Sequence, residues 1–278
     1  MLDLLIHSVD AVEQEVLRLQ SRFPPPTFVN LPGNIPAFRH DARECSDLLM
    51  SYLKCVRCVS MLRAGIVLMK NGFYQEVGIL CRCLSESFED VLFLAAPLGE
   101  DKKPSNAQIQ LTEEFFQEEF ADPSKPVASQ QKRQRVPRDQ VLAGIARING
   151  GALNPSDAKL IARLLHMGFS GYVHGAYPHT MELFEAKPDG RGLPDVASGQ
   201  YYMSGGMPGT RTAEMLGALA SRAHNTAVVV CIVGKRLNDK TTEERLNPMM
   251  DALSKATRSD VGNLNAAVKM VKQGKPLG

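Results

Sequence analysis

The stretch that decides the fold is LRAGIVLMKNGFYQEVGILCRCLSESFEDVLFLA, residues 62–95. Apolar residues recur through both halves of it with a helical period, and the pair Asn71-Gly72 interrupts this pattern in the middle. Asn and Gly are typical of helix ends, because both tolerate the left-handed backbone conformation that stops a helix. The stretch therefore predicts a helix over about 40–70, a tight turn, and a second helix over about 73–96 that runs back along the first.

The helical period also recurs along most of the remaining chain, with apolar residues three or four positions apart. We therefore predict an all-α fold, a helical bundle built on the long antiparallel helix hairpin, and a single helical domain over residues 1–278. The further helices are expected at about 2–19, 111–122, 154–175, 210–236 and 242–273.

Three segments interrupt the helical pattern. Residues 97–139 are largely polar and punctuated by proline, so we predict a polar insertion or loop region there, apart from the short acidic helix. Residues 194–207 surround the Gly-rich sequence GQYYMSGG, and we expect a small β-hairpin excursion between helices. The segment FPPPTFVNLPGNIPAF, residues 23–38, contains five prolines, which exclude a helix because proline breaks the hydrogen-bond ladder.

Composition limits the classes of protein that this chain can belong to. The formal net charge is only +2, so a contact with RNA would have to depend on a local basic patch. No stretch reaches the roughly 18 uncharged apolar residues of a membrane helix, and we expect no membrane partner. The six cysteines lie inside apolar helical patterns and not at the spacings of a disulfide scaffold. We therefore expect a reduced, cytoplasmic protein that has no disulfide and no cofactor.

Two cysteine pairs, Cys55 with Cys58 and Cys81 with Cys83, raise the question of a zinc site. Two positions apart on a helix means about 200° around its axis, so Cys81 and Cys83 cannot easily face one metal ion. No knuckle turns surround the other pair. Because free cysteine usually serves as a small buried hydrophobe, we expect no bound metal.

A basic run lies in QKRQRVPR, residues 131–138. Its charges could follow a phosphate backbone. However, acidic residues just upstream cancel most of its field at a distance, and such a run is more often a solvated loop. Both interpretations stay open. If the run contacts RNA, the binding residues are Lys132, Arg133 and Arg135, with His179 as a further polar residue beside the candidate site.

The sequence FSGYVHG, residues 169–175, contains the strongest candidate for chemistry. His166, Ser170 and His174 are spaced four apart and so share one face of a helix, and histidine is well suited to proton transfer near neutral pH. Gly171 and Gly175 are also four apart, and they predict a flat track on which another helix packs closely.

A second polar pair lies in the helix hairpin, where Arg82 and Glu86 are one helical turn apart. Two adjacent helices could therefore bring Arg82, Glu86, Ser170 and His174 together.

These residues, in LRAGIVLMKNGFYQEVGILCRCLSESFEDVLFLA and FSGYVHG, resemble a group of largely uncharacterised bacterial proteins. That group is related to the HEPN (higher eukaryote and prokaryote nucleotide-binding) all-α superfamily, and the resemblance covers about residues 45–185. It implies a helical bundle that is often dimeric. Some HEPN relatives are metal-independent ribonucleases, frequently toxins or defence effectors, with an Arg followed after four to six residues by a His. This chain departs from that signature, since two residues separate Arg163 from His166 and ten separate it from His174.

Two functions follow as hypotheses. The first is a metal-independent ribonuclease, in which His174 is the general acid or base and Arg82 stabilises the phosphate. Glu86 would orient one of these groups, and Ser170 completes the set of catalytic candidates. The second is a non-catalytic binding or dimerisation module, in which the same four residues form a structural hydrogen-bond network. The expected partners are accordingly RNA or a second copy of the chain.

Overall fold

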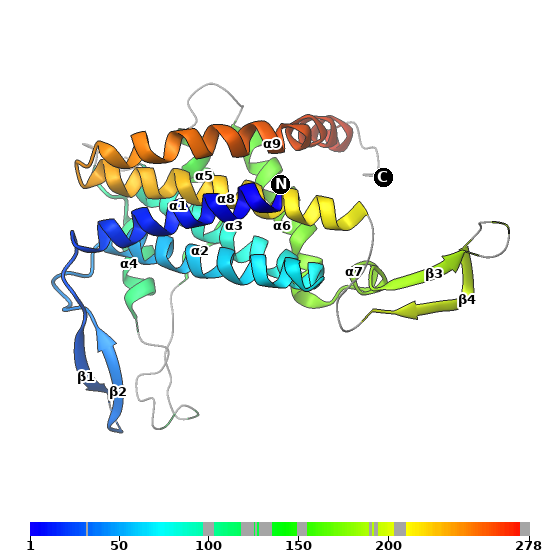
Figure 1. Ribbon diagram of the computed structural model, residues 1–278. Coiled ribbons are helices and arrows are strands. Elements are labelled where there is room, and N and C mark those ends of the chain that lie inside the picture. The colour runs from blue at the N-terminus through cyan, green and yellow to red at the C-terminus, as the bar shows by residue number, and fades with distance from the viewer. Residues whose placement is uncertain are drawn as a thin grey trace.

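The computed structural model describes residues 1–31, 33–96, 103–117, 125, 127, 135–148, 155–188, 191, 194–202 and 210–272 (Figure 1). Helices take up well over half of them, which confirms the predicted all-α fold. The elements are α1 (Leu2–Gln20), β1 (Thr27–Leu31), β2 (Ile35–Arg39), α2 (Asp47–Lys70), α3 (Tyr74–Ala95), α4 (Asn106–Phe116), α5 (Arg138–Ile148), α6 (Pro155–His174), α7 (Tyr177–Met181), β3 (Phe184–Pro188), β4 (Pro194–Tyr201), α8 (Thr210–Arg236) and α9 (Thr241–Lys272).

The α2–α3 hairpin forms as predicted. Helix α2 ends at Lys70, Asn71 is its C-cap, and Gly72 has a φ of 78°, the left-handed conformation that the sequence indicated. The start of α2 differs from the expected position near residue 40, because the Ser46 side chain accepts a hydrogen bond from the Leu49 N–H and caps the helix there. The two helices then pack antiparallel along their length.

Helix α8 is the centre of the bundle, in contact with α1, α2, α3 and α9. Its inward face is built from small and branched residues, of which Leu219, Ala220, Ala223 and Val230 are completely buried. Among the described residues, α8 is also long and apolar enough between Thr212 and Arg236 to cross a membrane, with a mean hydropathy of 1.4. However, 56% of that window is buried inside the bundle, as in the core helix of a folded domain.

Two small hairpins extend from the helices, at opposite ends of the bundle (Figure 1). The β3–β4 hairpin confirms the predicted excursion, although it begins upstream at Phe184, and residues 203–207 lie outside the described part of the chain. The β1–β2 hairpin has no counterpart among the expected elements. Its turn contains Gly33 and Asn34, both with positive φ, and these are the residue types that adopt that conformation most easily.

The segment from 97 to 139 contains more helix than its polar composition predicts. Helix α4 begins at Asn106, before the expected start at about 111, because Ser105 and Gln108 form a capping box. The Gln108 amide also donates to the main-chain oxygens of Phe93 and Ala96, which anchors α4 to the end of α3. Helix α5 was not expected. About half of the predicted loop region, including residues 97–102 and 128–134, lies outside the described residues.

Helix α6 packs on α3 through a different glycine from the two that the sequence suggested. Gly78 of α3 receives the aromatic ring of Tyr172, which leaves no room for a Cβ atom. Gly171 is instead covered by the ring of His179, and Gly175 has a φ of 57° and lies in open space at the end of α6. The prediction that α6 packs through Gly171 and Gly175 is therefore wrong. Gly171 makes room for the ring of His179, and Gly175 ends the helix.

We predict that Gly78→Ala lowers the free energy of unfolding by roughly 1–3 kcal/mol, because the added methyl group overlaps the Tyr172 ring. The matched control is Gly168→Ala in α6, where nothing lies within 4 Å of the new Cβ. That change should be neutral or stabilise the protein by up to about 1 kcal/mol. Chemical denaturation of both variants measures the difference, and equal effects would contradict the described contact between α3 and α6.

Candidate functional site

Arg82 of α3 makes the contact with α6 that the sequence suggested. Its Nε donates to Glu86 Oε1 at 3.0 Å, so the predicted pair one turn apart is formed. Its Nη1 donates to the main-chain oxygen of His166 at 2.9 Å. Arg82 therefore joins the two helices, but at the turn of α6 that carries His166.

The rest of the expected four-residue cluster is not assembled. Among the described residues, no hydrogen bond joins the side chain of Ser170 or His174 to Arg82 or Glu86. His174 is the last residue of α6 and is exposed. Because a helix rises about 1.5 Å per residue, His174 lies roughly 12 Å beyond the turn at which Arg82 binds. The catalytic role assigned to the four residues stays a prediction, without the shared hydrogen-bond network on which it depended.

Of the four residues expected to bind RNA, the structure describes Arg135 and His179. Lys132 and Arg133 lie outside the described residues. Arg135 is exposed, with its Nε 3.9 Å from Glu114 Oε1. The ring of His179 is folded against α6, where its Nε2 lies 3.1 Å from the main-chain oxygen of Gly168. His179 thus serves the packing at the end of α6, and its predicted contact with RNA gains no support from this position.

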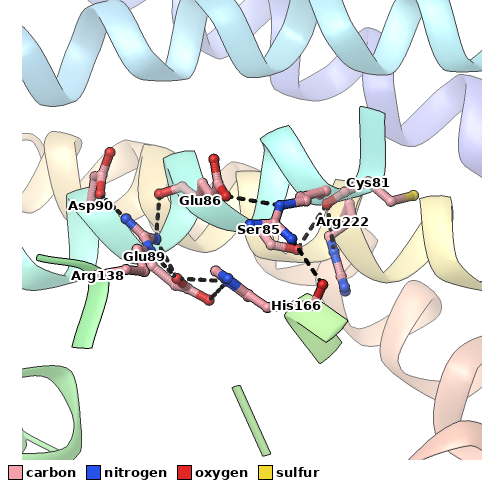
Figure 2. Close-up of polar contacts among 9 residues, drawn as sticks. Cys81, Ser85, Glu86, Glu89, Asp90, Arg138, His166 and Arg222 are labelled. Carbon is pink, nitrogen blue, oxygen red and sulfur yellow. Dashed lines mark hydrogen bonds and ion pairs between the residues drawn. The ribbon is translucent and has the colours of Figure 1, made fainter. Parts of the chain in front are cut away.

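The charged residues that do converge lie on one side of α3, where Glu86, Glu89 and Asp90 follow one another around the helix (Figure 2). Arg138, the first residue of α5, bonds to all three positions. Its Nε donates to Glu89 Oε2 at 2.9 Å, its Nη1 donates to Asp90 Oδ1, and its Nη2 donates to the main-chain oxygen of Glu86 at 3.0 Å. One guanidinium therefore fastens the start of α5 to two turns of α3.

His166 of α6 binds the same carboxylate from another side. Its Nε2 lies 3.0 Å and 3.1 Å from the two carboxylate oxygens of Glu89. From α2, the Lys54 ammonium lies 2.7 Å from Asp90 Oδ2. The side chains of Glu89 and His166 are only 12% and 13% exposed, so this charged cluster lies mainly beneath the surface. It connects α2, α3, α5 and α6.

Arg138, within the cluster, and Arg222, beside it, differ in the direction in which their surroundings shift the pKa. Burial lowers the pKa of Arg138, but the charges of Asp90 and Glu89 outweigh that effect, so its pKa lies above the ordinary value. Burial also lowers the pKa of Arg222 on α8, and for this residue the effect prevails over the charges of Cys81 and Glu89. Arg222 donates to the main-chain oxygen of Cys81 at 3.4 Å and lies over the ring of Phe169, with its guanidinium carbon 5.4 Å from the ring centre. Both guanidinium groups are therefore already engaged.

The pairing of Glu89 with His166 has one chemical consequence. A carboxylate bonded to Nε2 keeps the imidazole proton on that nitrogen and leaves Nδ1 as an acceptor, which is the arrangement of a general base. Four hollows of the described surface are lined by residues other than Glu89 and His166.

Metal ligation gains no support from the described part of the chain, in which no group of three or more His, Cys, Asp or Glu side chains could hold an ion. All six cysteines are free. Burial raises the pKa of the Cys58 and Cys81 thiols to about 11, so both are protonated and poor ligands at neutral pH.

Comparisons with known proteins add no identity: no family model, curated protein or solved structure matches this chain. The HEPN-like relationship accordingly stays a prediction from the sequence.

Sequence reasoning missed the centre of the cluster, although each member left a signal. Glu89 and Asp90 follow Glu86 at helical spacing. His166 shares a face with Ser170 and His174. Arg138 directly follows Pro137, and a proline just before a charged residue is a common start of a helix rather than part of a mobile basic loop.

We predict that Arg138→Met lowers the free energy of unfolding by roughly 3 kcal/mol, because it leaves Glu89 and Asp90 without their main partner. The control is Arg163→Met, which removes an exposed pair with Asp139 and should cost no more than about 1 kcal/mol. Denaturant unfolding of the two variants tests this. A loss from Arg138→Met no larger than that of the control would show that the cluster does not stabilise the fold.

Proposed function

We propose that this chain is a non-enzymatic binding module, in which the charged cluster holds helices together and the partner surface lies elsewhere. The observation that supports this most directly is the charge balance of the cluster. Each cation already binds a carboxylate or a main-chain oxygen, so none is left to hold a ligand. The cations are Lys54, Arg82 and Arg138, and the carboxylates are Glu86, Glu89 and Asp90.

A ribonuclease site makes a different demand on its charges. It must bind a phosphodiester anion and stabilise the further negative charge of the transition state, which requires positive groups that are free to approach the phosphate. In this cluster a phosphate would have to displace Glu86 from Arg82, or Glu89 and Asp90 from Arg138. The second exchange takes Arg138 away from two carboxylates that are largely buried, which costs several kcal/mol, whereas the first costs less because the Glu86 side chain is 39% exposed.

The partner surface that we propose is the apolar groove between α1 and α2. It is a hollow of about 890 Å³, and the apolar side chains of Leu17 and Val56 are exposed along it. The β1–β2 hairpin begins and ends at its margin. Exposed apolar side chains gathered in a hollow are a feature of protein–protein contact sites.

A second candidate function is RNA cleavage without a metal ion, with His166 in place of His174 as the proton-transfer group. The pairing of His166 with Glu89 favours it, since a carboxylate that fixes the imidazole tautomer is a common feature of catalytic histidines. The predicted resemblance to HEPN toxins and defence ribonucleases points the same way. Arg163, exposed on the same helix, is the cation best placed to meet RNA.

The two functions are separated by incubating the purified protein with a labelled single-stranded RNA in EDTA. We expect no cleavage above that of buffer alone. His166→Ala should lower the free energy of unfolding by roughly 1–3 kcal/mol, because Glu89 loses a buried partner. His174→Ala, at an exposed helix end, should change it by less than about 0.5 kcal/mol.

The binding-module proposal fails if the wild-type protein cleaves RNA and His166→Gln abolishes that activity while circular dichroism shows an intact fold. If His174→Ala instead abolishes the cleavage, His174 is the proton-transfer group, as the sequence predicted.

A further inference from the structure

We infer that the occupant of the α1–α2 groove is the β1–β2 hairpin of a second copy of this chain, in a reciprocal exchange of arms. The inference rests on the proposed function, because it names the partner of that surface. Four observations support it: the hairpin's exposure, its position, the chemistry of the groove and the area available for burial.

The hairpin is only lightly covered by the described part of its own chain. None of the residues described in β1 or β2 is buried, and the rings of Phe28 and Phe38 are 61% and 66% exposed. The two rings contact each other edge to edge, with centres 5.7 Å apart. An isolated two-stranded hairpin is only marginally stable in water. Its residues from Thr27 to Phe38 carry no charge, and the one charged residue of its strands is Arg39, exposed at the end of β2.

The arm cannot reach the groove of its own chain. The segment Pro24–Pro26, which leads into β1, lines the groove, and so does His40, which follows β2. Both ends of the hairpin are therefore fixed at the groove's margin, and Figure 1 shows the strands pointing away from the helices. The apolar groove and the exposed rings of the arm are therefore next to each other but do not contact each other within one molecule.

The chemistry of the groove matches an uncharged apolar arm. Its lining is mainly apolar, and its two charged residues, Glu13 and Arg63, bind each other. Arg63 also binds Asp10 at 2.6 Å. The groove thus presents no unpaired charge that burial under the arm would leave without a partner. A basic or acidic peptide would gain little here, whereas aromatic rings would remove apolar surface from water.

The aromatic rings of the two arms supply much of the area that a biological interface needs. A Phe side chain offers about 200 Å², so the exposed parts of Phe28 and Phe38 amount to roughly 250 Å² on one arm. The two arms of a symmetric dimer bury twice this area, and the groove surface that they cover contributes about as much again. The rings alone then approach the roughly 1,000 Å² that distinguishes a biological interface, before the other arm residues are counted. Because each copy gives one arm and receives one, the assembly closes at two chains.

The test is sedimentation velocity of the full chain over a concentration series. We expect a dimer. The arm variant Phe28→Ser/Phe38→Ser should raise the dissociation constant at least about 100-fold, as aromatic hot spots do. The groove variant Leu17→Glu/Val56→Glu should have the same effect, because both residues are exposed in the groove. The control is Tyr177→Ser, which removes an equally exposed aromatic ring from α7 and should leave the dimer intact.

A mixture of the arm variant and the groove variant adds a direct test of exchange. The groove variant still has an arm, and the arm variant still has a groove, so the mixture restores one of the two contacts and should associate more tightly than either variant alone. The inference is overturned if the wild-type protein is a monomer throughout, if its dimer survives both variants, or if the mixture associates no more tightly than the separate variants.

Failure of this inference and failure of the proposed function are distinguishable. A monomer without ribonuclease activity overturns the second-copy inference but leaves a binding module with a different partner. RNA cleavage that is abolished in His166→Gln overturns the binding-module proposal, whatever the oligomeric state.

Discussion

The Glu89 carboxylate is the point on which the outer helices depend, because Arg138 of α5 and His166 of α6 bind it together. The inner bundle of α1, α2, α3, α8 and α9 has a large apolar core to hold it. Helix α6 does not: among its described side chains, none of the apolar ones is fully buried. A buried carboxylate that loses a partner costs several kcal/mol, so α5 and α6 are tied to α3 and to each other.

The difference between the apolar core of the inner helices and the charged contacts of the outer helices bears on function. A cluster whose charges are all matched inside the protein favours one arrangement of helices over others, which is the best attested use of buried polar groups. It also has little capacity left for an external anion. The exposed apolar surface lies instead at the β1–β2 hairpin and in the adjacent α1–α2 groove, where the rings of Phe28 and Phe38 and the groove's apolar lining face solvent. The polar and apolar features therefore have separate roles: the first stabilises the fold, and the second is available to a partner.

Helical period and the Asn71-Gly72 stop were enough to predict the fold class and the central hairpin, because both depend on local backbone preferences and burial. The candidate site was predicted only in part. Residues His166, Ser170 and His174 share one helix face, so spacing cannot say which turn docks on α3. That choice depends on the packing of Tyr172 into Gly78, a contact between segments far apart in the sequence. The β1–β2 hairpin was missed because its strands are short, lie in a segment with five prolines and have no buried face to produce an alternating pattern.

A double-mutant cycle between Glu89→Gln and Arg138→Met tests most directly whether the cluster holds the outer helices. The free energy of unfolding is measured for the wild type, both single variants and the double variant. Residues that share a buried ion pair should show a coupling energy of about 2 kcal/mol or more, so that the double variant loses much less than the two single losses combined. Losses that add to within about 0.5 kcal/mol would mean that the two side chains act independently, and would contradict a structural role for their contact.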